Sequence, residues 1–382
     1  MAYVAARGGE QAIQNAEALY RLLNGQYDSS FVRSVENQLP YLLDRVMGES
    51  SLYSTELAAL AIAQTGGDLY EAVLLLRAYR STQPRVAYAE PIDSGSMLTV
   101  RRISAAFKDI PGGQILGPTL DYSHRVLHLE TIEESGKNTG ESEGVEAQGR
   151  KSAVSEGSKP IPRNVPYVAD WHRETGLMHP LKHDPTPSAE IADLTREPVM
   201  FPAPRAHRLQ ALSRADTGGI LALGYANMRG YGGIHPTVNE VRLAYADVRV
   251  RHPVTGALFG AGRVRYSQAE VVTKFKTGTD GRPALELGFA ATLGWNEVKL
   301  IAASMLDAAM DLPEPHPAHT EEFVLSHTEP VESSGFCIHY KLPHYVTFGS
   351  GLDALRKARE HSTAPHPGPL QEGEGAKEEV IG

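Results

Sequence analysis

The sequence predicts an α+β fold, with an N-terminal helical region followed by a mixed or antiparallel sheet with flanking helices. Two observations predict it: apolar residues recur at helical spacing before residue 84, and apolar and polar residues alternate between residues 241 and 250. Hydrophobic residues make up 41% of the 382 residues and charged ones 22%, as in soluble globular proteins. The length allows about two domains, each large enough to bury a core.

A short strand is predicted at residues 3–5, and three helices follow it. Apolar residues share one face over residues 13–23, and an Asn-Gly pair ends that helix. Residues 54–64 are predicted to form the second helix. Asp68 is predicted to cap the N-terminus of the third helix, and Pro84 is expected to end that helix.

Loops are predicted between these helices and the sheet. Residues 91–125 are rich in Gly, Pro and charge, and a loop of this length indicates a function. Residues 131–160 have few apolar side chains to offset their ordering entropy, so this low-complexity insert is expected to be mobile, with a Pro-rich continuation to residue 204. The predicted regions are 1–130, 131–204, 205–358 and a disordered tail, 359–382.

Strands are predicted from residue 219 onward. Residues 220–226 are a short apolar run, and half-buried alternation extends from Val241 to Val250. Residues 258–276 and 284–293 are expected to continue the sheet. Asn296 is expected to cap a helix with an apolar face formed by Val298, Ile301, Met305 and Ala308.

Charge and composition argue against several classes of protein. The formal net charge of −9 argues against a protein that wraps duplex nucleic acid. No run approaches the roughly 20 apolar residues of a membrane helix, and the N-terminus lacks the pattern of a secretory signal. The single cysteine, Cys337, cannot form an internal disulfide, so a cytoplasmic location is expected.

The chemically densest segment, residues 321–348, contains His339 and His344. Their separation of five residues suits neither one face of a helix nor one face of a flat strand. We therefore expect a strand that bends at Pro343 to bring both imidazoles together. Neutral imidazole is a common ligand of zinc and other transition metals, and a catalytic zinc usually has three protein ligands. Another residue or another chain would have to complete the site.

Two alternatives to a metal site remain at this segment. In the first, the two histidines make hydrogen bonds at the edge of a core. Cys337, two residues before His339, is a candidate thiolate ligand or nucleophile if its pKa is lowered, and a buried structural thiol otherwise.

A second candidate site lies in the segment RRISAAFKDIPGGQ. Arg101, Arg102 and Lys108 suit phosphate oxygens, and Gly112 with Gly113 allows backbone N–H groups to approach an anion. His124 follows in DYSHR and is a candidate for the same pocket. The alternative is a solvated charged face.

A third candidate is the loop RGYGGIHP, residues 229–236. Tyr231 is able to stack on a base, and His235 has a pKa suited to acid–base chemistry. The alternative is a hairpin turn with exposed side chains.

Taken together, these segments resemble the PhnI family, the I subunit of the bacterial carbon–phosphorus lyase core complex. The resemblance covers residues 2–130 and 205–358, and its most specific stretches are KDIPGGQ-x-LGPT-x-DY and KLPHYV. Three positions depart from the family pattern: Tyr340 stands in place of Leu, Thr347 in place of Asp, and Pro330 in a more polar segment. The two histidine positions of the family's HxKLPH pattern match His339 and His344.

The resemblance implies a role in the use of phosphonates. Such subunits transfer the ribose 5-triphosphate of ATP or GTP from the purine to an alkylphosphonate, which gives α-D-ribose 1-methylphosphonate 5-triphosphate from methylphosphonate. Alone, they act as nucleosidases. The implied partners are G-, H- and L-type subunits, and a J-type radical enzyme that later cleaves the C–P bond. The implied metals are zinc at His339 and His344, and magnesium on the nucleotide.

In this interpretation the phosphate-binding residues are Arg101, Arg102, Lys108, Gly112 and Gly113. Tyr231 contacts substrate, and His124 and His235 are candidates for proton transfer. Two alternatives stay open: a scaffold subunit that supplies two metal ligands to a site shared with the J-type partner, and an independent metallohydrolase.

Overall fold

The computed structural model describes residues 9–130, 132, 165–180, 191–226, 236–277, 281–341 and 345–362. The chain divides into two units. Residues 27–333 form the larger unit, and residues 1–26 together with 334–382 form the smaller one. Helix α1 (Gly9–Asn24), most of α12 (Pro330–Lys341) and all of α13 (Tyr345–Ser362) belong to the smaller unit. The predicted strand at residues 3–5 lies outside the described residues.

The larger unit begins with four helices that pack around one apolar cluster. They are α2 (Ser29–Gln38), α3 (Pro40–Ser50), α4 (Thr55–Gln64) and α5 (Leu69–Thr82), with buried Val46, Met47, Ile62 and Val73 among the cluster's residues. Three side chains cap helices by accepting hydrogen bonds from backbone N–H groups of the first turn: Asp28 for α2, Ser54 for α4 and Asp68 for α5. The helix predicted at residues 54–64 is confirmed as α4 and the helix after Asp68 as α5. In the smaller unit, the helix predicted at residues 13–23 is confirmed as α1.

A four-stranded antiparallel sheet follows, with the strand order β1-β2-β3-β4. Its strands are β1 (Leu98–Ile103), β2 (Thr237–Arg251), β3 (Leu258–Thr277) and β4 (Pro283–Leu293). The predicted α+β class and the three later strands are confirmed. The prediction of an uninterrupted loop over residues 91–125 is wrong at β1, because two consecutive arginines hide the strand pattern of that short segment.

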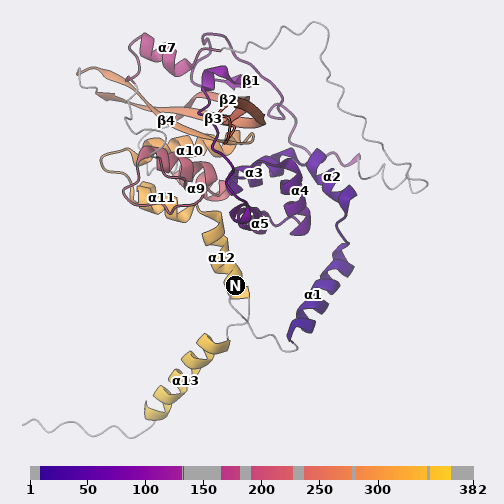
Figure 1. The fold of residues 1–382 in the computed structure, drawn as a ribbon. Helices are drawn as coiled ribbons and strands as arrows, with labels where there is room; N and C mark the ends of the chain where they lie inside the picture. Colours follow the sequence, from indigo (N-terminus) through magenta and orange to yellow (C-terminus); the bar gives the residue numbers. More distant parts are fainter. Residues whose placement is uncertain are drawn as a thin grey trace, which may run out of the picture. The chain divides into compact units, whose positions relative to one another are not determined.

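Helices cover one face of the sheet (Figure 1). They are α8 (Arg205–Arg214), α9 (Thr217–Ala226), α10 (Glu297–Met310) and α11 (Glu321–His327), and their core includes Val241, Ala269 and Ala290 from the strands. The strand predicted at residues 220–226 is wrong, since these residues belong to α9. Gly224 allows α9 to pack closely on α10, because a Cβ there would lie 2.9 Å from the Cβ of Ala302.

The opposite face of the sheet is covered by α7 (Val168–Glu174) and by the loop that follows β1 (Figure 1). Residues 165–180 and 191–204, assigned above to the insert, therefore include structured parts of the larger unit, and residues 133–164 and 181–190 lie outside the described residues. Short 3-10 turns occur at η1 (Ser94–Ser96) and η4 (Pro317–His319).

The helix predicted after Asn296 is confirmed as α10, but Asn296 does not cap it with its side chain. The Asn296 side-chain amide instead donates to the carbonyl oxygens of Asp44 and Leu293, each at 3.1 Å. It thereby ties the start of α10 to α3 and to the end of β4. The predicted apolar face is also wrong, because Val298 is 64% exposed and the buried face instead includes Leu300, Ala303 and Leu306. Within the described ranges, no helix combines the length and the apolar character needed to cross a membrane.

Candidate functional site

The loop that follows β1, residues 104–125, is held by two neighbouring arginines. Arg101 and Arg102 are adjacent on the strand, so their side chains leave opposite faces of the sheet. Both are buried, with 5% and 0% of their surface exposed. Each therefore fixes a different half of the loop.

Arg102 fixes the first half. Its Nη1 donates to the carbonyl oxygens of Pro111 at 2.6 Å and Gly113 at 2.9 Å. Its backbone exchanges two hydrogen bonds with Ile115, of 2.7 and 2.8 Å, so the loop returns along the outer edge of β1. A direct contact between Arg102 and a phosphate would require the guanidinium to give up these protein acceptors.

Arg101 fixes the second half. Its Nη1 donates to the carbonyl of Leu116 at 2.6 Å, and its guanidinium pairs with Asp121 and, at 2.7 Å, with Glu297 at the start of α10. The loop crosses β1 at Gly117, which has a φ of +64°. A Cβ at Gly117 would lie 2.3 Å from the carbonyl oxygen of Val100, so only glycine fits this crossing.

The side chain of Gln114 closes the turn between these contacts. Its Oε1 accepts from the backbone N–H of Ser104 at 2.8 Å, and its Nε2 donates to the carbonyls of Ser104 and Phe107, both at 3.1 Å. Lys108 lies on the outside of this turn and is exposed. Gly112 and Gly113 both have positive φ. The N–H of Gly113 donates to the carbonyl of Ile110 at 2.9 Å, so this N–H already has an acceptor within the loop.

Glu240 of β2 joins the loop to α7. One of its oxygens accepts from the Nε atoms of Arg102, at 2.8 Å, and Arg242, and the other accepts from the N–H of Val168 at 2.8 Å. Both arginines also donate to the carbonyl of Pro166, at 2.7 and 2.8 Å. The guanidinium of Arg242 stacks over the ring of Tyr167, 3.6 Å from its centroid. One buried carboxylate thus positions β1, β2 and the start of α7.

Glu270 of β3 lies directly opposite Glu240 in the sheet. Burial, together with the charge of Glu240, raises the pKa of Glu270 to about 7. Asn239 donates its Nδ2 to Glu270 at 2.8 Å, which acts in the opposite direction. The site therefore contains a buried carboxyl group that holds a proton close to neutral pH.

An aromatic group lies beneath the loop. His172 of α7 is fully buried, with ring centroids 4.4 Å from Phe107 and 4.7 Å from Trp171. Burial lowers the pKa of His172, so its ring is neutral at neutral pH. Neither ring nitrogen has a hydrogen-bond partner in the described part of the chain. The residue packs the loop against α7.

Sequence reasoning missed these buried groups, although one signal was present. Glu240 and Arg242 are two residues apart in a strand with apolar neighbours, so they share one face of it. A pair of opposite charges on one face of a predicted strand indicates a buried polar network. His172 and Glu270 carried no comparable signal.

The remaining predicted residues either make no contact with this network or lie outside the described residues. His124 is exposed, three residues after Asp121. Tyr231, His235 and His344 lie outside the described residues.

The histidine motif belongs to α12, in the smaller unit. The prediction of a strand there is wrong, because residues 330–341 form a helix and His339 is exposed on it. Cys337 is also exposed, so it is not a buried thiol. Two residues apart on a helix, Cys337 and His339 are rotated by about 200° and do not face one another. Among the described residues, no three His, Cys, Asp or Glu side chains form a group that suits a metal ion.

Comparison with known proteins identifies the family. A family model described as a bacterial phosphonate metabolism protein, PhnI, matches residues 2–362. The chain belongs to the PhnI family. The resemblance inferred from the sequence is thereby confirmed.

Three relatives match this chain over nearly their whole length. The alpha-D-ribose 1-methylphosphonate 5-triphosphate synthase subunit PhnI of Rhizobium meliloti is 40% identical, over 95% of this chain and 96% of the relative. The subunit of the same name from Escherichia coli is 39% identical, over 94% and 98%. The protein HtxH of Stutzerimonas stutzeri is 45% identical, over 98% and 99%.

The stretches that carry the PhnI resemblance lie in different units. The KDIPGGQ motif is in the loop that Arg101 and Arg102 hold, and the HYKLPH motif begins at the end of α12. Pro330, a departure from the PhnI pattern, is the first residue of α12, where its fixed φ and missing N–H are tolerated. Tyr340, another departure, packs against Phe336 with ring centroids 5.1 Å apart.

Proposed function

We propose that this chain is the I subunit of an α-D-ribose 1-methylphosphonate 5-triphosphate synthase in the carbon–phosphorus lyase system. It transfers the ribose 5-triphosphate unit of ATP or GTP from the purine to an alkylphosphonate, and it acts as a nucleosidase when alone. The observation that carries the proposal is the identity of 40% and 39% to two synthase subunits over nearly the full chain. The G-, H-, J- and L-type subunits are its proposed partners.

The reaction sets two chemical demands. Breaking an N-glycosidic bond builds positive charge on the ribose and negative charge on the departing base, so a general acid is needed near the base. His124 and His235 are the proposed donors. A phosphonate oxygen then attacks C1′, and exclusion of water decides between transfer and hydrolysis. Partner subunits that close the site would explain why the product differs in the complex.

The triphosphate needs cationic contacts, and magnesium is expected on its oxygens. Lys108 is the proposed direct contact, which is supported by its exposure in the same loop as Gly112 and Gly113. Arg101 and Arg102 are proposed to act by shaping the loop and by their positive charge, because protein acceptors already occupy their guanidinium groups. Tyr231 is proposed to stack on the purine.

The proposed metal site uses His339 and His344. A further ligand from the J-type partner would complete it, since three protein ligands are usual for a catalytic zinc. When bound, a zinc ion supplies positive charge to an anionic ligand.

One observation favours a second candidate, a scaffold subunit without its own chemistry. His339 is exposed on a helix, and the described residues offer no group of three ligands. In this alternative the chain supplies His339 and His344 to a site shared with the J-type partner.

Purine release separates the two candidates. The purified chain incubated with GTP should release free guanine, measured by chromatography. With the partner subunits and methylphosphonate, phosphorus NMR should detect the ribose 1-methylphosphonate product. A folded chain that releases no guanine contradicts the nucleosidase and favours the scaffold.

A substitution tests the phosphate contact. Lys108→Ala should raise the KM for GTP about tenfold or more, because one charge-assisted contact is lost. The matched control is Lys357→Ala on α13, an exposed lysine outside the loop. An unchanged KM in Lys108→Ala would remove Lys108 from the site.

A further inference from the structure

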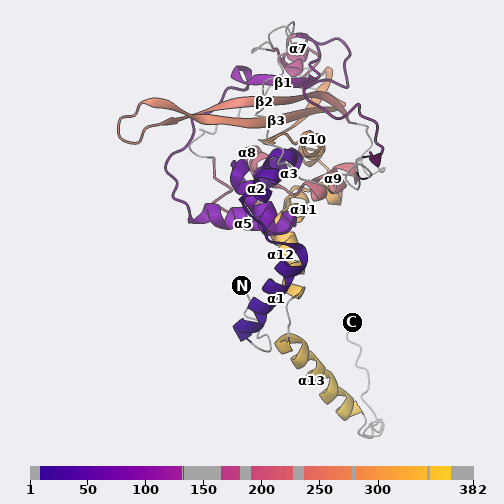
Figure 2. The same cartoon turned by 90° about the vertical axis from the view of Figure 1, so that its right-hand side faces the viewer.

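The paired strands β2 and β3 extend beyond the rest of the sheet. β1 pairs with β2 only as far as Tyr245, and β4 pairs with β3 only from Tyr266 onward. Residues 246–265, called the arm below, therefore form a two-stranded ribbon that projects past the helices (Figure 2).

The two edges of the arm differ. The β2 edge is partly covered, since Ala89 bridges Val250 and the N–H of Glu90 donates to the carbonyl of Arg249 at 2.8 Å. The β3 edge, residues 258–264, pairs with no second strand in the described ranges. Such an edge presents backbone N–H and C=O groups to any extended chain that approaches it.

The arm is basic on a protein that is acidic overall. It contains four arginines and one aspartate, whereas the chain has a net charge of −9. Three arginines have acidic partners: Arg263 pairs with Asp247 at 2.6 Å, Arg251 with Glu90 at 2.6 Å and Arg265 with Asp44 at 3.1 Å. Arg249 is exposed and makes no ion pair with a described acidic residue.

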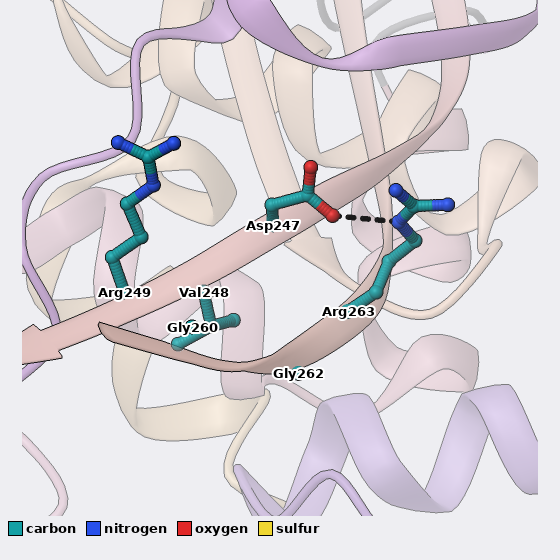
Figure 3. Close-up of a pocket in the computed structure, with 6 residues that line it drawn as sticks. All are labelled: Asp247, Val248, Arg249, Gly260, Gly262 and Arg263. Carbon is teal, nitrogen blue, oxygen red and sulfur yellow. Dashed lines mark hydrogen bonds and ion pairs between the residues drawn. The ribbon is translucent and has the colours of Figure 1, made fainter.

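A shallow hollow lies beside Arg249 (Figure 3). It is lined by Asp247, Val248, Arg249, Gly260, Gly262 and Arg263. Gly260 is the pairing partner of Arg249, and a Cβ built on Gly260 would meet no atom within 4 Å. Gly260 therefore places no side chain between the free β3 edge and Arg249.

Apolar side chains accompany this cation at the end of the arm. Val254, Leu258 and Phe259 are 86%, 44% and 47% exposed. Exposed apolar side chains beside an unpaired strand edge are typical of a protein interaction surface.

We propose that the free β3 edge of the arm docks an extended acidic segment of a partner protein, which pairs with β3 as an added strand and places a carboxylate on Arg249. The added strand lies about 10 Å from β2, two strand spacings away. An arginine and a glutamate side chain together span that distance over Gly260. Backbone pairing supplies the register, and the carboxylate supplies the charge preference.

Two other occupants fit less well. A second copy of the arm offers no further acidic residue to Arg249, because its one aspartate, Asp247, is already paired with Arg263. A nucleic acid would meet three exposed apolar side chains, which offer no contact to its phosphates.

Hydrogen exchange with two designed peptides tests the proposal. One five-residue peptide alternates Glu with Val, and the other has Lys in place of Glu. The acidic peptide should slow amide exchange within residues 258–264 of the full chain, detected by mass spectrometry, and the basic peptide should not.

Charge reversal supplies the second measurement. Arg249→Glu should weaken binding of the acidic peptide at least tenfold. Arg33→Glu on α2 is the matched control, because it changes the net charge equally at an exposed site away from the arm. The proposal is overturned if residues 258–264 exchange at the same rate with and without the acidic peptide, if both peptides protect them equally, or if the two variants bind alike.

Discussion

Two glutamates face each other at the centre of the site, but their surroundings differ. Glu240 accepts hydrogen bonds from Arg102 and Arg242, which stabilise its negative charge. Glu270 accepts from the uncharged side-chain amide of Asn239. Because like charges on opposed strand positions repel, the pair is best accommodated with Glu240 ionised and Glu270 protonated.

This asymmetry predicts a pH-dependent free energy of unfolding. The pKa of Glu270 is about 7 in the folded protein, against an ordinary value of 4.5, so the folded state binds more protons between these pH values. Its contribution to stability therefore falls as pH rises from 4.5 to 7, by up to about 3 kcal/mol. Glu270→Gln keeps an acceptor for Asn239 and should remove this loss.

Urea unfolding at several pH values measures the effect. Glu270→Gln should match the wild type near pH 4.5 and become the more stable protein towards pH 7.5. Glu174→Gln, an exposed glutamate at the end of α7, is the control and should follow the wild type. Parallel curves for Glu270→Gln and wild type would show that Glu270 is ionised at neutral pH.

At the scale of residues, the sequence predicted cations in the loop but not their partners. Arg102 meets Glu240 from 138 positions away, and Arg101 meets Glu297 from 196 positions away. No local pattern contains such pairs, so two buried structural arginines and two phosphate ligands have the same sequence signature. The pairing of His339 with His344 stays a prediction, because His344 lies outside the described residues.

At the scale of elements, the contact between β4 and α10 depends on a missing side chain. A Cβ at Gly288 of β4 would lie 2.0 Å from the carbonyl oxygen of Ser304 and 2.9 Å from the Cβ of Ala308. Backbone atoms of the helix cannot move aside as a flexible side chain can. The close approach of the two elements therefore requires glycine at this position.

Gly288→Ala should destabilise the protein by about 3 kcal/mol, because overpacking would push α10 away from the sheet. Thermal unfolding followed by circular dichroism measures the change. The matched control is Gly260→Ala on β3, where a Cβ would meet no atom within 4 Å, and its melting temperature should stay close to that of the wild type. Equal melting temperatures for all three proteins would contradict the close packing.

Element prediction succeeded where periodicity and capping agreed. Asp68 both caps α5 and precedes its apolar face, so the start of that helix was readable. Residues 220–226 are apolar on all sides, and such a run fits a buried strand as well as a buried helix. The structure has the helix, in which Gly224 packs closely on Ala302 of α10.

At the scale of the whole molecule, polar contacts join the helical cluster of α2–α5 to the core beneath the sheet. Arg45 of α3 pairs with Asp216 before α9 at 3.0 Å, and Glu49 accepts from the hydroxyl of Thr217 at 2.6 Å. Lys299 of α10 is buried nearby and donates to the carbonyl of Ser213 at 2.6 Å. The succession of an N-terminal helical region and a later sheet was predictable from the sequence, but these contacts were not, since their charged residues come from distant segments.

Lys299 gives these contacts their own pH dependence. Burial lowers its pKa to about 8, against 10.5 ordinarily, so the unfolded state binds more protons between these values. The contribution of Lys299 to stability therefore rises with pH across that window, by up to about 3 kcal/mol. Lys299→Met should lack this rise when urea unfolding is compared at pH 7.5 and 9.5. Exposed Lys357→Met is the control, and an equal rise in all three proteins would contradict the burial effect.

The position of β1 has a consequence for engineering. β1 comes from the first third of the chain, yet it forms the edge of a sheet whose other strands all follow residue 236. A cut between residues 131 and 164 would sever none of the described strand pairings. Two separately expressed fragments, 1–130 and 165–382, should therefore recombine without a covalent link, with the strand and its two arginines serving as the recognition element of a split protein.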